Sequence, residues 1–206
     1  MAVKMAGELA KDFDAIGLFL DANFIPDLSA MSKAVRAAGS EWAPCINYQY
    51  DNCMGSLYAP PGTDILRRTW ESAIKDDATL MQFVTWNDYG EHTSLAPTLS
   101  TGYTIGEINA LLNQQWKTGK APTSEWDRIY ATYRRHAPDA TFFPFSKYRP
   151  DPDGALEILT VLPTPGRVRL PGRQVDGQPI EYDAPAGMHV RQFPLDAGPV
   201  LSLIHI

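Results

Sequence analysis

Short apolar runs alternate with amphipathic stretches of helical spacing through the first half of the chain, and this alternation restricts the fold more than any other feature. The expected order is a helix at residues 1–12, a strand at 15–20, a helix at 28–38, a strand at 42–48, a helix at 63–77, a strand at 80–86 and a helix at 105–117. Consecutive strand–helix units indicate a parallel α/β sheet, either a barrel or a doubly wound sheet. Three units are too few for an eightfold barrel of about 250 residues, so they are expected to form its C-terminal part.

Residues at the helix ends support this order. Asp27 is expected to be the N-cap of one helix, and Thr63 or Asp64 begins the next. Gly39 and Gly119 follow the last apolar positions of two helices, where glycine commonly ends a helix.

From residue 151 the apolar pattern changes to a period of two, with short runs separated by Pro-Gly and Asp-Gly turns. This pattern predicts an antiparallel β-sandwich. The expected domains are a partial (β/α)8 barrel at residues 1–120, a bridging segment at 121–150 with a helical piece at 124–134, and the start of a β-sandwich at 151–200.

The two ends predict that the 206 residues are a fragment of a longer protein. Residues 1–12 form a charged, helix-like run with no signal-peptide pattern. Residues 201–206, LSLIHI, match the in-frame translation of a common sequencing adapter and are expected to be a non-native tail. We expect the isolated fragment to be inactive, because a barrel without its first strands has unpaired edges.

Composition excludes several classes of protein. The net charge of −6 and a pI near 5.2, without a basic stripe, argue against a nucleic-acid partner. The longest apolar runs are far shorter than the roughly 20 residues of a membrane span. The four histidines lack metal-ligand spacing, so a metal site is not expected. Cys45 and Cys53 either form one bridge or remain thiols, and the oligomeric state stays open.

The residues with the clearest chemistry follow the third expected strand, where functional groups gather in parallel α/β folds. Residues 85–92 read TWNDYGEH and contain two carboxylates, Asp88 and Glu91. Such a pair suits hydrolysis of a sugar–sugar bond by general acid and base. We expect the backbone freedom of Gly90 to turn Glu91 to the side of Asp88. The spacing allows the wider carboxyl separation of an inverting enzyme and the narrower one of a retaining enzyme.

Neighbouring residues are candidate sugar contacts. Trp86 and Tyr89 are expected to stack on pyranose rings, and Asn87 to hydrogen-bond sugar hydroxyls, although packing and turn-forming roles are open for all three. Other candidates follow the earlier strands: Asp21, Asn23 and Tyr48.

Residues 84–91, VTWNDYGE, resemble the signature of glycoside hydrolase family 71, the endo-α-1,3-glucanases or mutanases. Residues 115–122, QWKTGKAP, resemble a second segment of the family. Residues 133–136 with 138–140, and residues 186–188 with 193–195 and Gly198, resemble two more in the same order. Residues 92–97, HTSLAP, depart from the usual continuation of the signature.

This resemblance implies a (β/α)8 barrel followed by a β-sandwich, and an inverting two-carboxylate hydrolase of α-1,3-glucan that needs no cofactor. It places Glu91 as general acid and Asp88 as general base, with the reverse order left open. A polymeric substrate also implies an extracellular protein. The alternatives are a related barrel hydrolase of different linkage specificity and a non-catalytic carbohydrate-binding or surface protein.

Overall fold

The computed structural model describes residues 1–19, 27–52, 56–58, 62–133, 155–175 and 178–194. The helices within these residues are α1 (Ala2–Leu9), α2 (Leu28–Ala37), α3 (Asp64–Lys75) and α4 (Thr104–Thr118). The strands of the first half are β1 (Ala15–Gly17), β2 (Glu41–Ala43), β3 (Cys45–Ile46), β4 (Tyr50–Asn52), β5 (Ser56–Tyr58) and β6 (Gln82–Phe83). Those of the second half are β7 (Arg128–Thr132), β8 (Ala155–Leu162), β9 (Gly166–Val175), β10 (Gln178–Ala184) and β11 (Gly187–Pro194).

The first half has the predicted parallel strand–helix order. β1 pairs with β2 in parallel, and β3 pairs with β6 in parallel, with a helix between the members of each pair. Each helix buries an apolar stripe against its neighbours, as the spacing of Leu28, Met31 and Val35 on α2 indicates. These two parallel pairs are separate sheets, so the described residues form part of an α/β arrangement and no closed barrel.

The helix ends lie close to their predicted positions. Asp27 is the N-cap residue of α2 and Thr63 that of α3, although neither side chain accepts a capping hydrogen bond from a backbone N–H of its helix. Gly119 ends α4 in the left-handed conformation with φ 68°, a region where a Cβ is costly. Within the described residues, no helix has both the length and the apolar character needed to cross a membrane.

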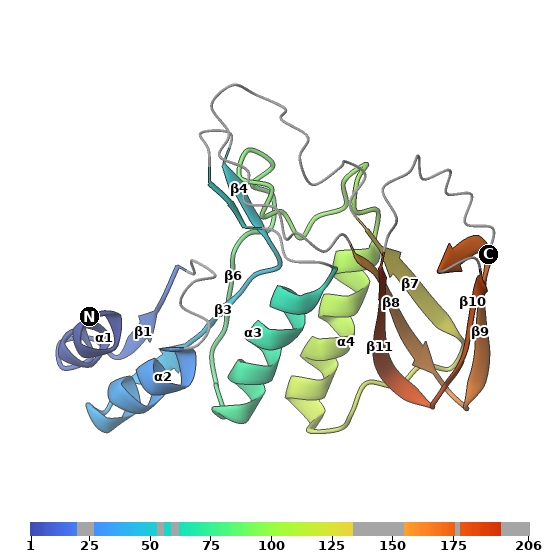
Figure 1. Ribbon diagram of the computed structural model, residues 1–206. Coiled ribbons are helices and arrows are strands. Elements are labelled where there is room, and N and C mark those ends of the chain that lie inside the picture. Colours follow the sequence, from blue (N-terminus) through green and yellow to red (C-terminus); the bar gives the residue numbers. More distant parts are fainter. Residues whose placement is uncertain (20–26, 53–55, 59–61, 134–154, 176–177, 195–206) are drawn as a thin grey trace.

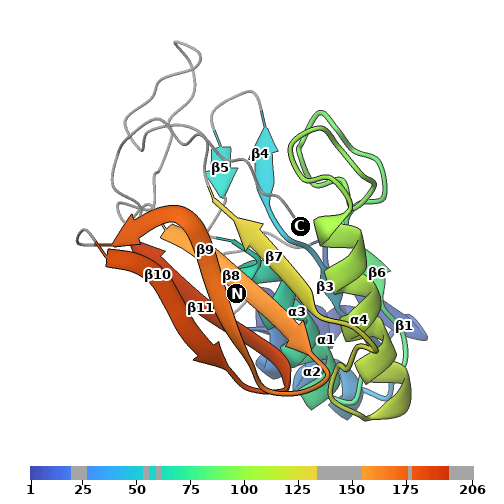
Figure 2. The same ribbon diagram turned by 90° about the vertical axis from the view of Figure 1, so that its right-hand side faces the viewer.

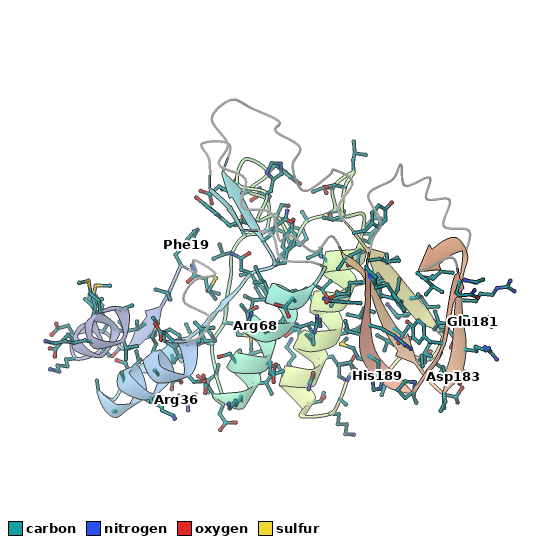
Figure 3. The ribbon with its side chains drawn as sticks, in the orientation of Figure 1. Phe19, Arg36, Arg68, Glu181, Asp183 and His189 are labelled. Carbon is teal, nitrogen blue, oxygen red and sulfur yellow. The ribbon has the colours of Figure 1, made fainter. Side chains whose placement is uncertain are left out.

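The predicted strands of the first half are shorter than expected. Only Ala15–Gly17 of residues 15–20 is a described strand, and Phe19 is 59% exposed rather than buried (Figure 3). Residues 42–48 divide into β2 and β3 around Pro44, which has no N–H to donate to a ladder. Among the described residues, each parallel sheet has two strands.

The second half contains two antiparallel sheets. β8 lies at the centre of one, between β7 and β11, and β9 pairs with β10 in the other. A cluster including Leu156, Ile158, Val168 and Ile180 packs between them. The prediction of antiparallel strands is confirmed, whereas the start of a β-sandwich at residues 151–200 stays a prediction.

The predicted helical piece at residues 124–134 is wrong. Residues Arg128–Thr132 form β7, which pairs with β8 from Arg128 opposite Val161 to Thr132 opposite Glu157. The ring of Tyr130 is buried against the helices, so alternate residues of β7 face different surroundings. Pairing with a strand that follows far along the chain outweighs the local helical pattern.

Helices α3 and α4 lie between the parallel strands and the antiparallel sheets, and both views of the ribbon show this arrangement (Figures 1 and 2). Leu159 and Val161 of β8 pack toward these helices, while Leu156 and Ile158 face β9 and β10. β8 is therefore buried on both faces, which accounts for its nearly continuous apolar sequence.

One carboxylate stands in this buried strand. Glu157 is 0% exposed and accepts hydrogen bonds from the Thr63 N–H at 2.7 Å and the Thr63 hydroxyl at 2.6 Å. Arg67 of α3 adds an ion pair at 3.0 Å, and the amide of Gln192 donates at 3.4 Å. A Cβ on Gly62 would lie 2.4 Å from the Glu157 carboxyl carbon, and Gly62 has φ 64°, so the approach requires glycine. This cluster joins the three-stranded sheet to the start of α3.

We predict that Glu157→Gln lowers the free energy of unfolding by about 2–4 kcal/mol, because it leaves the Arg67 guanidinium without its buried anion. The matched control is Glu181→Gln on β10, where Glu181 forms an exposed pair with Arg167 at 2.8 Å (Figure 3). That change should cost at most about 1 kcal/mol. Urea unfolding of the three proteins measures both effects, and equal losses would contradict the structural role given to Glu157.

Candidate active site

The predicted catalytic segment, TWNDYGEH, lies in a loop that follows β6. Residues 85–96 form this loop, which we call the site loop, and its two ends are hydrogen-bonded to each other. The Thr85 N–H donates to the Thr93 carbonyl at 3.1 Å, and the Leu95 N–H donates to the Thr85 carbonyl at 2.9 Å. The hydroxyls of Thr85 and Thr93 are 2.9 Å apart, and Ala96 N–H donates to the Trp86 carbonyl at 2.9 Å. The base of the loop is therefore closed like a short hairpin.

The site loop emerges at the carboxyl edge of the parallel strands. Its base includes fully buried Thr93 and nearly buried Ser94, whose hydroxyl donates to the Trp86 carbonyl at 3.0 Å. Both views place this region beside the β4–β5 hairpin, at the end where α3 and α4 begin (Figures 1 and 2). The loops after β3 and β6 thus meet at one edge, as expected for parallel strands.

Asp88 and Glu91 belong to one turn at the tip of the site loop. The Asp88 N–H donates to the Thr85 hydroxyl at 2.9 Å, and the Glu91 N–H donates to Asp88 Oδ1 at 2.9 Å. Both carboxylate residues are half-buried. The Asp88 side chain therefore fixes the backbone of Glu91, which also gives Asp88 a structural role in the turn.

The prediction that Gly90 turns the chain through glycine-specific backbone freedom is wrong. Gly90 lies outside the left-handed region, and a Cβ there would meet only Asp88 Oδ1, at an ordinary contact distance of 3.5 Å. The positive φ falls on His92 instead, at 52°. The hydrogen bond from Glu91 to Asp88, rather than a flexible glycine, brings the two residues together.

Two large aromatic rings stand exposed on the site loop. Trp86 is 66% exposed and Tyr89 is 56% exposed, and Asn87 between them is also exposed. Exposed rings of this size offer flat apolar surfaces with polar groups beside them, which suits contact with a sugar ring. The placement of these three residues is compatible with the predicted sugar contacts.

The structure does not bring Tyr48 to the site surface. Tyr48 is only 4% exposed and lies in the core between β3 and the helices, so its ring cannot stack on a ligand. Burial raises the pKa of Tyr48 to about 12. Asp21 and Asn23 lie outside the described residues, as does Cys53, while Cys45 is buried.

Three residues that support the site were not selected from the sequence. Thr85 and Thr93 close the base of the loop, and Gln49 donates from its side-chain amide to the His92 carbonyl at 2.7 Å. The sequence shows only that Thr85 and Thr93 are polar residues on either side of the carboxylate pair, and that Gln49 is a polar residue directly after the second expected strand. Their role depends on contacts that a sequence pattern does not contain.

Comparisons with known proteins give one kind of match. No protein-family model matches the chain, and no curated protein matches it either. Among solved structures, the chain is similar to a GH99 endo-alpha-mannosidase from Bacteroides thetaiotaomicron in complex with BIS-TRIS-Propane. The identity is 13%, the TM-score is 0.45, and the match covers 52% of this chain and 41% of that one.

A second structure of the GH99 endo-alpha-mannosidase from Bacteroides thetaiotaomicron has 14% identity and a TM-score of 0.44, with 51% of this chain and 39% of that chain covered. This chain spans about two fifths of the length of the two structures.

We predict that Gly90→Ala changes the free energy of unfolding by no more than about 0.5 kcal/mol, because the backbone and the space around Gly90 accept a Cβ. Gly119→Ala is the matched control, and its φ of 68° should make the same change cost about 1 kcal/mol. Thermal unfolding compares the two variants. A Gly90 variant that loses as much as the Gly119 variant would restore the turn-forming role of Gly90.

The buried Tyr48 predicts a loss of stability in alkali. The unfolded state gives up the phenol proton near pH 10, whereas the folded state holds it to about pH 12, so ionisation favours unfolding between these values. The contribution of the protonated Tyr48 to the free energy of unfolding is fully present below pH 10. As the pH rises toward 12, this contribution is lost at up to about 1.4 kcal/mol per pH unit. Tyr48→Phe should remove this part of the slope, which urea unfolding across the range measures. Parallel pH curves for the variant and the wild type would contradict it.

Proposed function

We propose that the chain carries the acid and base of a glycoside hydrolase, and that its substrate is α-1,3-glucan, cleaved with inversion. The observation that supports this most is the hydrogen bond from the Glu91 N–H to Asp88 Oδ1, which ties both carboxylate residues into one turn. This turn stands on a closed loop base and contains the exposed Tyr89, with the exposed Trp86 two residues before it. The proposed specificity for the α-1,3 linkage and the proposed inverting mechanism come from the resemblance of residues 84–91 to the signature of family 71.

The roles follow from the hydrogen bonds of the turn. An ionised carboxylate accepts a backbone N–H best, which fits Asp88 as the base and leaves Glu91 as the acid. Asp88 Oδ1 accepts the Glu91 N–H, so the second carboxylate oxygen is the one proposed to receive a proton from water. The water oxygen attacks the anomeric carbon, the glycosidic bond breaks, and the Glu91 carboxyl gives its proton to the leaving oxygen.

The surroundings suit an extended sugar polymer. Trp86 and Tyr89 are proposed to stack on sugar rings on either side of the carboxylates, with Asn87 donating to hydroxyls. A polymer of this kind is degraded outside the cell, so the proposal includes an extracellular site of action. A partial (β/α)8 barrel joined to a β-sandwich is the proposed architecture.

A second candidate is a non-catalytic carbohydrate-binding protein. The same hydrogen bond to Asp88 favours this candidate. A carboxylate that accepts a backbone N–H of its own turn stabilises the turn, and this structural role explains Asp88 without catalysis. The exposed rings of Trp86 and Tyr89 would then be the binding surface. This candidate requires binding of a glucan without formation of products.

The deciding experiment compares Asp88→Asn and Glu91→Gln with the wild type, as these 206 residues and within the longer protein that the resemblance predicts. Reducing-end release is measured on α-1,3-glucan, an α-1,4-glucan and a β-1,3-glucan. We expect each variant to lose about 10²- to 10⁴-fold in rate on α-1,3-glucan and to keep its affinity in gels containing the polymer. The controls are Glu125→Gln and Asp127→Asn, which remove exposed carboxylates of the same kinds.

Other results of this experiment would support different conclusions. Full activity in both variants would overturn the catalytic assignment, and binding without products by the wild-type longer protein would favour the second candidate. Cleavage of another glucan would leave the two-carboxylate chemistry and change the linkage. The anomer of the first product, read by NMR, distinguishes inversion from retention.

A further inference from the structure

Gln49 connects the loop after β3 to the loop after β6. Its side-chain amide nitrogen lies 2.7 Å from the His92 carbonyl and 3.1 Å from the Tyr48 hydroxyl. A glutamine amide has two N–H donors, and these two acceptors account for both. The reversed orientation would place its carbonyl oxygen against the His92 carbonyl, so the contact itself determines which way the amide points.

The backbone on the Gln49 side of this connection is held by buried residues. The Gln49 N–H donates to Asn47 Oδ1 at 3.0 Å, and Asn47 is only 3% exposed. The Asn47 carbonyl accepts from the Thr69 hydroxyl of α3 at 3.3 Å. The Tyr48 ring is packed in the core. Gln49 therefore reaches out from a backbone that a helix and a buried ring hold in place.

The other side of the connection is the strained part of the site loop. His92 has φ 52°, a conformation that costs a residue with a Cβ about 1 kcal/mol or more. It stands between Glu91, whose N–H is bound to Asp88, and Thr93, whose carbonyl accepts from Thr85. The Gln49 bond falls on the carbonyl of this residue, one position after Glu91.

We propose that Gln49 is a positioning residue, which holds the backbone of Glu91 and His92 so that the Glu91 carboxyl keeps its place relative to Asp88. This inference rests on the proposed function. Gln49 acts through the His92 carbonyl and does not contact the sugar. Because a displacement of about 1 Å at a reacting group can cost about 100-fold in rate, one hydrogen bond at this place has a large effect on turnover.

The test replaces Gln49 by methionine, which has a similar length and no donor. Its matched control is Gln114→Met on the exposed face of α4. Steady-state kinetics of the longer protein on α-1,3-glucan should show kcat falling by about 10- to 100-fold with KM within about twofold of the wild type. Gln49→Glu, which presents an acceptor to the His92 carbonyl, should lower kcat at least as far.

A second measurement does not depend on activity. In hydrogen exchange, Gln49→Met should speed exchange of the Glu91 amide by at least about 10-fold, because the turn it belongs to loses a support. The Val84 amide, bonded to the Ile46 carbonyl at 3.0 Å, should keep its protection and shows that the fold is intact. The Gln114 variant should leave both amides unchanged.

The outcomes separate the inference from the proposed function. Unchanged kcat and unchanged Glu91 exchange in Gln49→Met would overturn the inference while a cleaving wild type upholds the function. A rise in KM with kcat unchanged would also overturn it, since that result belongs to a sugar contact. If the wild-type longer protein neither binds nor cleaves any glucan, the proposed function fails, and the exchange of Glu91 alone decides whether Gln49 orders the loop.

Discussion

The buried Glu157 carboxylate is the interaction on which the arrangement of this protein depends. It lies at 0% exposure in a strand that is apolar on both faces, so the cost of removing it from water has to be offset locally. The N–H and hydroxyl of Thr63 and the Arg67 guanidinium supply that compensation at the start of α3. The positive end of the helix favours the same charge. The three-stranded sheet and α3 are consequently held in one relative position by charge as well as by apolar contact.

Helix α3 also connects the Glu157 cluster to the candidate site. The Thr69 hydroxyl of the same helix meets the Asn47 carbonyl, and Asn47 orients the backbone of Gln49. The site loop itself is bonded across its base through Thr85 and Thr93 and is exposed at its tip. A closed base with an accessible tip is the arrangement that the proposed acid and base require, because they need both fixed geometry and room for a ligand.

Much of the first half was predictable because its signals are local. Helix α4 ends at Gly119 because of the left-handed preference of glycine, and α2 and α3 begin near Asp27 and Thr63, where apolar residues of helical spacing start. The place of the carboxylates follows from the strand order. The prediction failed where a partner decides the conformation. Residues 128–132 read locally as a helix and pair with β8, and Tyr48 is a core residue because α3 and the sheet enclose it.

The sequence by itself determined the parallel order of the first half, the antiparallel strands of the second and the turn that contains Asp88 and Glu91, because periodicity and turn chemistry act within a few residues. Only the tertiary structure decided which polar groups meet. Glu157 and Thr63 are 94 residues apart, and Gln49 and His92 are 43 apart. Such pairs form because buried donors and acceptors must be satisfied wherever the packed elements bring them, and no local pattern specifies that partner.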